Sequence, residues 1–367
     1  MELWELDTPC LIINLDKFEK NIKRMSRYCK ENKINLRPHI KTHKVPEIAK
    51  MQVESGAIGI TSAKVTEAEV MVNAGLKDIL IAYPVYGEPK LNKLINLAES
   101  TNITVALDSE IVAEGISKKA QERGKQISIL LEVDVGMRRC GWELGEEFIK
   151  SSKRINDMKG VKVQGIMFYP GYISSVMPDN SEVGKLLKKL QEDIDKAYDV
   201  FKSLGIKINV FSGGSTPTAF LSHRLKGVTE IRPGTYVFND LNVVGSGAVT
   251  EEDCALFVLT TVVSTTVKGK MMLDAGSKTM SSDPLKAKNG RGFGKICGYE
   301  DLFIEKMNEE HGYVDISKSD KKFKVGDKLL VIPNHACTTM NMHNEVYGLR
   351  NNKVELCWQI SARGKVR

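Results

Sequence analysis

The chain of 367 residues is too long for one small domain and fits two. Hydrophobic residues make up 42% and charged residues 27%, as in globular proteins with a large core, and no apolar run approaches the length of a membrane span. The net charge of +7 is modest, and lysines are interleaved with acids, as in residues 185–193, which argues against a nucleic-acid-binding surface and favours a small anionic ligand.

The cysteines and the N-terminus indicate the compartment. Seven cysteines are scattered from Cys10 to Cys357 without a CxxC pair, which favours reduced thiols over a disulfide framework. The first seven residues are acidic and lack the basic and apolar regions of a signal peptide. We therefore expect a cytoplasmic protein.

Strands and helices are expected to alternate over the first two thirds of the chain. Residues 10–15 predict a short apolar strand, and Asp16 caps a helix that runs to about Lys30. Further strands are expected over 35–40, 57–60, 78–82, 103–107, 127–133, 161–168 and 207–211, with a last extended piece at 228–231. Helices are expected over 46–55, 64–73, 88–99, 109–123, 144–155 and 181–203, with a short one after Pro217.

Without the first strand, this pattern contains eight strand–helix steps, the number that closes a parallel (β/α)8 TIM barrel. The strands are apolar along their length, as in residues 127–133, which is typical of buried parallel strands. An open doubly wound sheet is the alternative architecture.

After about residue 250 the chain becomes rich in strands. Residues 257–267, 270–274 and 329–332 are β-rich, and residues 352–360 alternate like a strand. We therefore expect a barrel over residues 16–248 and a C-terminal β domain over 249–367. The leading strand, within residues 1–15, fits either part.

The segment Leu36–Pro46 is the first candidate for chemistry. Lys41 lies at the carboxyl end of a predicted strand, just before a helix, and in α/β folds this edge is where active sites collect. Positive charge nearby disfavours the ammonium form, and an unprotonated amine can form a Schiff base with a carbonyl. The neighbours that carry charge or share protons are Arg37, His39, His43 and Lys44. The alternative is a basic loop that binds phosphate or faces water.

Two later loops predict a phosphate site. Residues 212–218, Ser-Gly-Gly-Ser-Thr-Pro-Thr, follow a strand and precede the short helix, so that backbone N–H groups can approach an anion. Arg232-Pro-Gly234 forms the next loop, and barrels commonly build a phosphate site from their last two loops. The alternatives are an ordinary turn and a surface ion pair for Arg232.

His335-Ala-Cys337 predicts a metal site. Residues i and i+2 of a strand point to one side, so imidazole and thiolate can converge on one ion. Nitrogen with sulfur suits zinc. The alternative is a buried cysteine beside a surface histidine.

Six motifs in order give a resemblance to a known family. The chain resembles the D-threonine aldolase and D-serine dehydratase family, which are fold-type III pyridoxal-phosphate enzymes related to alanine racemase. The resemblance covers essentially the whole chain and rests on residues 37–44, 134–141, 212–217, 232–236, 274–278 and 333–337.

This resemblance implies a fold and a set of roles. The fold is an alanine-racemase-like barrel followed by a β domain with which the leading strand packs. Lys41 would hold pyridoxal 5'-phosphate covalently, the residue matching Arg232 faces the pyridine nitrogen in alanine racemases, and His343 would be peripheral to the metal. The implied cofactor-binding residues are Lys41, His39, Arg139, Tyr169, Ser215, Thr216, Arg232, Gly234 and Thr235, and the implied metal ligands are His335 and Cys337.

The resemblance also implies an activity and a homodimer, with residues 274–278 near the shared site. Aldolase members tend to carry His-x-Asp and bind harder ions, whereas dehydratase members tend to carry His-x-Cys and bind zinc. The histidine that usually follows the tyrosine in the aldolase branch is absent from residues 171–175. We expect a lyase that depends on pyridoxal phosphate and a divalent metal, acts on D-3-hydroxy amino acids and resembles D-serine dehydratase. The alternatives are a D-threonine aldolase, an amino-acid racemase and a non-catalytic cofactor carrier.

Overall fold

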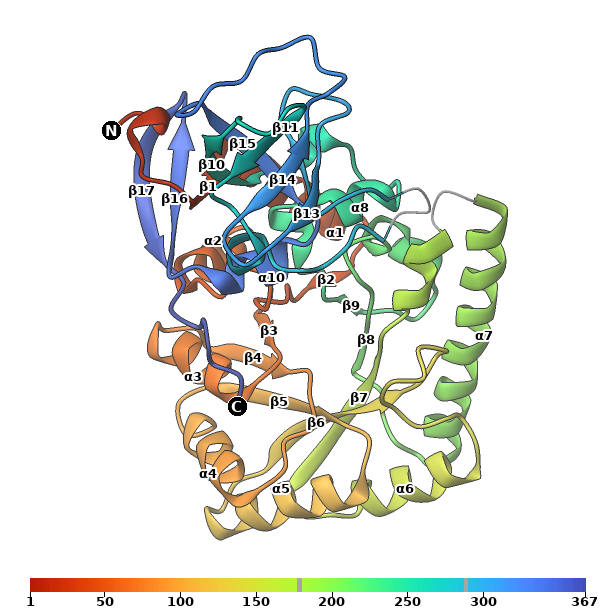
Figure 1. Ribbon diagram of the computed structural model, residues 1–367. Helices are drawn as coiled ribbons and strands as arrows, with labels where there is room; N and C mark the ends of the chain where they lie inside the picture. Colours follow the sequence, from red (N-terminus) through yellow and green to blue (C-terminus); the bar gives the residue numbers. More distant parts are fainter. Residues whose placement is uncertain (177–179, 287–289) are drawn as a thin grey trace. The chain divides into compact units, whose positions relative to one another are not determined.

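The computed structural model describes residues 1–176, 180–286 and 290–367, and the chain forms two compact units (Figure 1). The barrel unit comprises Met25–Lys41, Pro46–Gly234 and Lys365–Arg367. The β unit comprises Met1–Arg24, Thr42–Val45 and Thr235–Gly364. Each unit is described by itself. The domain bounds expected from the sequence, with a change at residues 248–249, stay a prediction.

Eight parallel strands form the sheet of the barrel unit, in the order β2-β9-β8-β7-β6-β5-β4-β3. A parallel bridge between His39 and Thr61 links the chain after β2 to β3, and the Ile40 N–H donates to the Thr61 carbonyl at 2.8 Å. The predicted (β/α)8 barrel is therefore confirmed, and the alternative of an open doubly wound sheet is wrong. The strands are β2 (Asn35–Leu36), β3 (Ile60–Ser62), β4 (Asp78–Ile81), β5 (Asn102–Leu107), β6 (Ile127–Val133), β7 (Val161–Phe168), β8 (Val210–Gly213) and β9 (Glu230–Ile231).

Helices follow most of these strands and lie outside the sheet (Figure 1). Within the sheet, side chains from four successive strands form one apolar cluster made of Leu80, Ala106, Leu130 and Met167. The helices are α2 (Pro46–Glu54), α3 (Val65–Asn73), α4 (Glu88–Leu97), α5 (Glu110–Glu122), α6 (Glu146–Asn156) and α7 (Asn180–Ser203), with a 3-10 turn η2 (Gly171–Val176) before α7. A further helix, α1 (Leu15–Glu31), begins in the β unit and ends in the barrel unit. None of the helices in the described ranges has both the length and the apolar character that a membrane span requires.

Two local expectations for the barrel are wrong. The strand expected over 35–40 is regular only over Asn35–Leu36, because Pro38 has no N–H to donate to a neighbouring strand. The helix expected after Pro217 is a 3-10 segment, η3 (Ala219–Arg224). A segment this short has little of a helix dipole, so an anion there would rely on individual backbone N–H groups.

The β unit contains a mixed sheet in which β1, near the start of the chain, pairs antiparallel with β10 and parallel with β16. The main path is β13-β14-β11-β10-β1-β16-β17, and β15 pairs with β10 and β12. The strands are β1 (Cys10–Asn14), β10 (Leu256–Ser264), β11 (Lys270–Leu273), β12 (Gly294–Ile296), β13 (Ile304–Met307), β14 (Gly312–Asp315), β15 (Lys328–Pro333), β16 (Glu345–Arg350) and β17 (Lys353–Gln359). The short helices are α8 (Leu241–Gly245), α9 (Ser277–Met280) and α10 (Ala336–Met342), with 3-10 turns η1 (Leu3–Glu5), η4 (Thr235–Val237) and η5 (Glu251–Asp253).

Candidate active site

Most of the predicted site residues follow the carboxyl ends of barrel strands. Lys41 follows the segment of β2, Arg139 follows β6, and Tyr169 follows β7. The loop after β8 holds Ser215 and Thr216, and the loop after β9 holds Arg232 and Gly234. Because all the strands are parallel, these loops share one edge of the barrel, which is where enzymes of this architecture carry their active sites.

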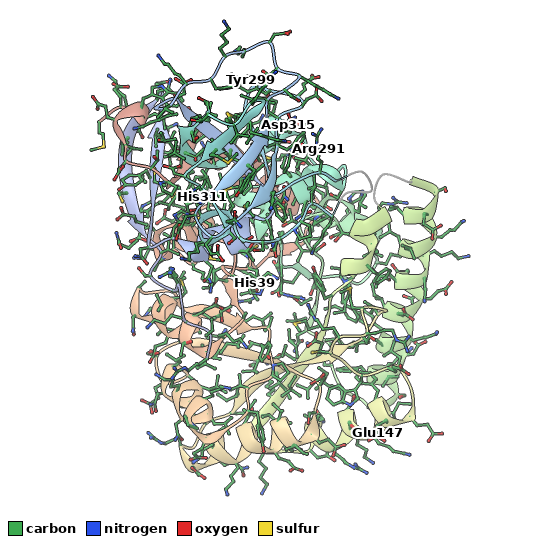
Figure 2. All side chains as sticks on the ribbon, viewed as in Figure 1. His39, Glu147, Arg291, Tyr299, His311 and Asp315 are labelled. Atoms are coloured by element: carbon green, nitrogen blue, oxygen red, sulfur yellow. The ribbon has the colours of Figure 1, made fainter. Side chains whose placement is uncertain are left out.

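Lys41 lies in the turn after the bridge residue His39, which is labelled in Figure 2. Its side chain is exposed, and its backbone N–H donates to the His39 Nδ1 at 3.3 Å. Arg37 does not supply the unbalanced positive charge expected near Lys41. Its Nε donates to a Glu230 carboxylate oxygen at 2.7 Å, and its Nη1 pairs with Asp78.

Arg232 is buried and bonded on two sides. Its Nη2 donates to the Phe168 carbonyl at 3.0 Å, and its Nη1 donates to the Ser212 hydroxyl at 2.5 Å. Ser212 in turn donates to Glu230 at 2.6 Å, which also accepts from Arg37. Burial lowers the pKa of Arg232 to about 10, so the guanidinium stays charged at neutral pH. Arg232 is therefore a fixed internal cation and not the surface ion-pair partner that was the alternative.

The structure brings Arg139 and Tyr169 together. The Arg139 guanidinium carbon lies 4.8 Å from the centre of the Tyr169 ring, and its Nη2 lies 3.9 Å from a Glu132 carboxylate oxygen. Arg138, the preceding residue, has a left-handed backbone with φ of 51°, and its N–H donates to the Asp134 carboxylate at 3.0 Å. Arg139 is thus the arginine of this loop that faces the aromatic ring.

The glycines after β8 allow a close backbone approach. A Cβ on Gly213 would collide with the Phe168 ring, and Gly214 has a left-handed φ of 91°. The Ser215 N–H donates to the Thr218 hydroxyl at 3.1 Å, and the two hydroxyls lie 3.0 Å apart. Ser215 and Thr216 are both buried. This small-residue loop is compact, and part of its hydrogen bonding is internal.

The His335-Ala-Cys337 motif does not lie on a strand, as was expected. β15 ends at Pro333, His335 is the N-cap residue of α10, and Cys337 is the second residue of that helix. The two side chains nevertheless meet, because Cys337 forms a hydrogen bond with His335 that raises the pKa of the imidazole to about 9.

Other side chains of the β unit surround this pair. The His335 Nδ1 lies 2.6 Å from an Asp283 carboxylate oxygen, which also accepts from the Thr338 hydroxyl at 2.9 Å. The Cys337 sulfur lies 3.1 Å from the hydroxyl of Thr42, the residue after Lys41 in the chain. Thr235, which the resemblance implies to be a cofactor-binding residue, has its hydroxyl 3.6 Å from the same sulfur.

The sequence analysis missed Asp240 and Asp283. Asp240 is 1% exposed and accepts two backbone N–H groups at 2.9 Å, from Val243 of α8 and from Ala336 between the motif residues. An Asp just before a helix is a known N-cap signal, which would have identified its role at α8. Asp283 has no comparable local signal, because its partner His335 lies 52 residues away.

The donor set fits a metal ion. The imidazole of His335 and the thiol of Cys337 interact, and Asp283 lies at the His335 Nδ1, as carboxylates do behind metal-bound histidines. Over residues 1–176, 180–286 and 290–367, no group of three or more His, Cys, Asp or Glu side chains is arranged to hold a metal. The Nε2 atom of His343 lies 3.1 Å from the carbonyl oxygen of Thr279.

The barrel edge fits pyridoxal phosphate. It presents an exposed amine on Lys41, a buried cation at Arg232 and a loop of small residues at 213–216. These are the groups needed to bind an aldehyde, a pyridine ring and a phosphate, respectively.

Comparisons with known proteins agree with this chemistry. Residues 13–241 match the family model of the alanine racemase N-terminal domain, and residues 255–349 match that of a serine dehydratase domain. The chain is 31% identical to 3-hydroxy-D-aspartate aldolase of Paracoccus denitrificans, covering 100% of this chain and 94% of that one. It is 32% identical to D-threo-3-hydroxyaspartate dehydratase of Delftia sp., covering 92% of each.

Solved structures give the same result. The crystal structure of D-threonine aldolase from Filomicrobium marinum matches with a TM-score of 0.93 at 30% identity, covering 100% of this chain and 98% of that one. A cysteine-to-alanine variant of a D-threo-3-hydroxyaspartate dehydratase, in the metal-free form, matches with a TM-score of 0.90 at 30% identity, covering 98% of both chains. The chain therefore belongs to the alanine-racemase-like family of D-threonine aldolases and D-serine dehydratases, which are pyridoxal-phosphate-dependent lyases.

Proposed function

We propose that this protein is a pyridoxal-phosphate- and metal-dependent lyase that removes water from D-3-hydroxy amino acids, in the manner of D-serine dehydratase. The products would be a keto acid and ammonia. The observation that carries this proposal is the hydrogen-bonded His335–Cys337 pair at the start of α10, beside Thr42, which follows Lys41 in the chain. A retro-aldol cleavage to glycine and an aldehyde is the second candidate, because the relatives include aldolases and that reaction needs the same residues.

Each predicted residue has a proposed role. Lys41 would hold the cofactor, Arg232 would face its ring nitrogen, and Arg139 with Tyr169 would lie against its ring. The phosphate would bind at Ser215, Thr216, Gly234 and Thr235, with His39 beside Lys41. When bound, the cofactor supplies an electron sink for the substrate α-carbon, and the metal supplies a Lewis acid for the β-hydroxyl.

The chain's own residues would then move and hold the protons. Lys41 Nζ would accept the substrate α-proton, because it is an exposed amine on a turn whose backbone is bonded to His39. Arg232 would keep its proton at neutral pH, since its pKa is about 10, and the Phe168 carbonyl and the Ser212 hydroxyl fix its guanidinium in place. A charged arginine facing the pyridine nitrogen would keep that nitrogen unprotonated.

His335 and Cys337 would hold the metal, and sulfur with nitrogen favours zinc over harder ions. Two protein ligands leave positions for water and for the substrate hydroxyl. The His-x-Cys pattern and the absence of a histidine from residues 171–175 favour dehydration over retro-aldol cleavage. We also propose a cytoplasmic homodimer, with a barrel over residues 16–248, a β domain over 249–367 that the leading strand joins, and residues 274–278 near the shared site.

A product assay tests the proposal. The purified protein, loaded with pyridoxal phosphate and zinc, is given D-serine, D-threonine and D-threo-3-hydroxyaspartate, and keto acid, glycine and aldehyde are measured. Keto acid from D-serine or D-threo-3-hydroxyaspartate supports the dehydratase, whereas glycine with aldehyde supports the aldolase. A chain that forms none of these products refutes both.

Two controls separate the remaining alternatives. Lys41→Ala should abolish product formation, whereas Lys50→Ala, at an exposed position of α2, should leave it unchanged. Removal of metal by a chelator should stop a lyase that polarises a hydroxyl. Inversion of an amino acid that continues without metal would instead indicate a racemase.

A further inference from the structure

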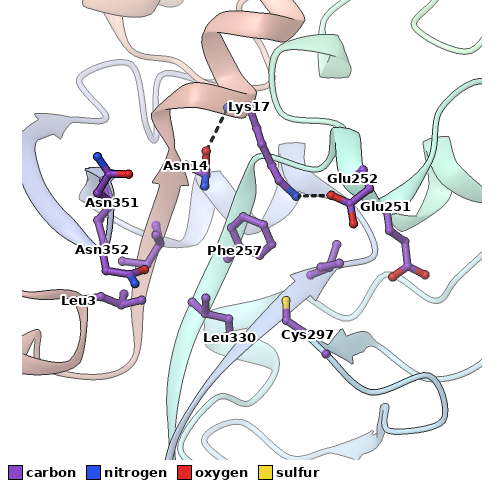
Figure 3. A pocket seen from close by; sticks show the side chains of 14 residues that line it. Leu3, Asn14, Lys17, Glu251, Glu252, Phe257, Cys297, Leu330, Asn351 and Asn352 are labelled. Atoms are coloured by element: carbon purple, nitrogen blue, oxygen red, sulfur yellow. Dashed lines mark hydrogen bonds and ion pairs between the residues drawn. The ribbon is translucent and has the colours of Figure 1, made fainter.

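A pocket in the β unit contains none of the residues proposed for catalysis (Figure 3). Its volume is about 310 Å3, within the range of small-molecule pockets. The apolar side chains that line it belong to one core cluster or pack against it: Leu3, Ile12, Phe257, Leu330, Ile332 and Leu349. The pocket is therefore lined by side chains of the core and can bury an apolar group.

The thiol of Cys297 adds to this apolar surface. Burial raises the pKa of Cys297 to about 12, so the group is a neutral thiol at physiological pH. A neutral thiol behaves as a small apolar side chain. The floor of the pocket thus carries no charge.

The rim carries a loose pair of opposite charges. The Lys17 Nζ lies 3.7 Å from a Glu252 carboxylate oxygen and 5.7 Å from the centre of the Phe257 ring on the pocket floor. The Glu252 side chain is 88% exposed, and exposed pairs of this kind contribute little to stability. A ligand carboxylate can therefore bind Lys17 in place of Glu252 at small cost.

The neighbouring carboxylate, that of Glu251, already has a cation as its partner. The Lys295 Nζ binds a Glu251 carboxylate oxygen at 2.5 Å, which balances the charge of Glu251. Glu252 is released when a ligand carboxylate binds Lys17, and it lies close enough to Lys17 to pair with a cation on the same ligand. A ligand that carries both signs therefore makes two ion pairs at the rim, whereas a ligand of one sign makes only one.

Carboxamides line another side of the pocket. Asn351 and Asn352 form the two-residue turn between β16 and β17, with left-handed φ angles of 50° and 62° that suit asparagine in a hairpin. In Figure 3 they lie on the other side of Phe257 from Glu252. Asn14 accepts the Lys17 N–H at 3.0 Å through its Oδ1. These amides can donate and accept hydrogen bonds to a polar head group.

We propose that this pocket binds a free α-amino acid with an apolar side chain. The carboxylate pairs with Lys17, the ammonium pairs with Glu252, and the side chain occupies the floor against Phe257 and Leu330. A bare carboxylic acid can pair only with Lys17, and an amine can pair only with Glu252, so each makes one of the two ion pairs that an amino acid makes. The site is separate from the reaction proposed above and does not depend on it.

Isothermal titration calorimetry of the cofactor-loaded protein with L-leucine tests this proposal. Three analogues each lack one part of the ligand: 4-methylpentanoate lacks the ammonium, 3-methylbutylamine lacks the carboxylate, and glycine lacks the side chain. L-Leucine should bind at least tenfold more tightly than each of them. Equal binding of 4-methylpentanoate or of the amine would overturn the assignment to an amino acid.

Variants of the protein locate the bound ligand. Lys17→Met should weaken L-leucine binding at least tenfold, while Lys20→Met, at an exposed position of the same helix, should leave it unchanged. Leu330→Phe narrows the pocket and should also weaken binding, with circular dichroism to check its fold. Absence of L-leucine binding at millimolar concentration, or binding that survives Lys17→Met unchanged, overturns the proposal.

Discussion

Asp240 offers the sharpest test of how the metal motif is held in place. Its carboxylate is buried and accepts two N–H groups, one at the start of α8 from Val243 and one at the start of α10 from Ala336, each at 2.9 Å. Ala336 stands between His335 and Cys337. Replacing Asp240 should therefore affect both the stability of the chain and its affinity for metal.

The expected loss follows from these two hydrogen bonds. A buried N–H left without an acceptor costs about 1–3 kcal/mol, so Asp240→Ala would cost about 2–6 kcal/mol for the pair. Burial of the carboxylate is itself unfavourable, as the raised pKa of Asp240 shows, and its removal offsets part of this cost. We expect a net loss of about 2–4 kcal/mol for Asp240→Ala and about 1–2 kcal/mol for Asp240→Asn, which keeps one acceptor oxygen.

Urea unfolding followed by circular dichroism measures the stability, and titration of the metal-stripped protein with cobalt measures the affinity through thiolate absorbance. Ser109→Ala is the matched control, because Ser109 is the N-cap residue of α5 and its side chain makes no capping hydrogen bond. That control should change the stability by less than about 0.5 kcal/mol. The reasoning is refuted if Asp240→Ala matches the control in both measurements.

Three further predictions concern groups that hold or surround the proposed site. Asp283→Asn should weaken cobalt binding about 10–100-fold, because the carboxylate that orients the His335 ring is lost, and an unchanged titration curve would exclude that role. Arg232→Lys should lower the free energy of unfolding by about 1–3 kcal/mol, because an ammonium cannot reproduce both hydrogen bonds of the buried guanidinium, and an unchanged urea midpoint would contradict this. Burial raises the pKa of the Glu132 carboxyl, although the positive charges of Arg232 and Arg139 act to lower it. The Glu132 carboxyl therefore keeps its proton to a higher pH in the folded chain than in the unfolded chain. The contribution of Glu132 to stability therefore falls as the pH rises above 4.5, and Glu132→Gln should gain stability relative to the wild type between that pH and neutrality, which thermal unfolding at several pH values measures.

The barrel was predictable because its signal is local and repeated. Each strand is a short apolar run, as at Ile127–Val133, and each is separated from the next by a helical pattern or a turn. The prediction failed where one residue or one short segment decides the structure. Pro38 ends the regular part of β2, and the chain after Pro217 forms a 3-10 segment instead of an α-helix before β9.

The proposed site was harder to predict because its contacts join distant parts of the chain. The spacing of His335 and Cys337 indicated convergence, and the two side chains do meet, but at a helix start and not on a strand. Asp240 and Asp283 were missed because their contacts with residues 335–336 span 96 and 52 positions. A single sequence carries no signal for such pairs, whereas the loops at the strand ends share an edge as soon as the parallel order is known.

The four residues after Lys41 fix the backbone next to it, although the Lys41 side chain itself is exposed. The Thr42 hydroxyl lies 3.1 Å from the Cys337 sulfur, and the Lys44 Nζ donates to the Asn341 carboxamide at 3.0 Å, so this segment is bonded twice to α10. The Lys44 carbonyl also accepts the Ala362 N–H at 3.0 Å. On the other side of Lys41, His39 is bridged to Thr61 of the barrel. The backbone on both sides of Lys41 is therefore held by these contacts while its side chain is exposed, which suits the roles proposed for it, binding a cofactor and accepting a proton.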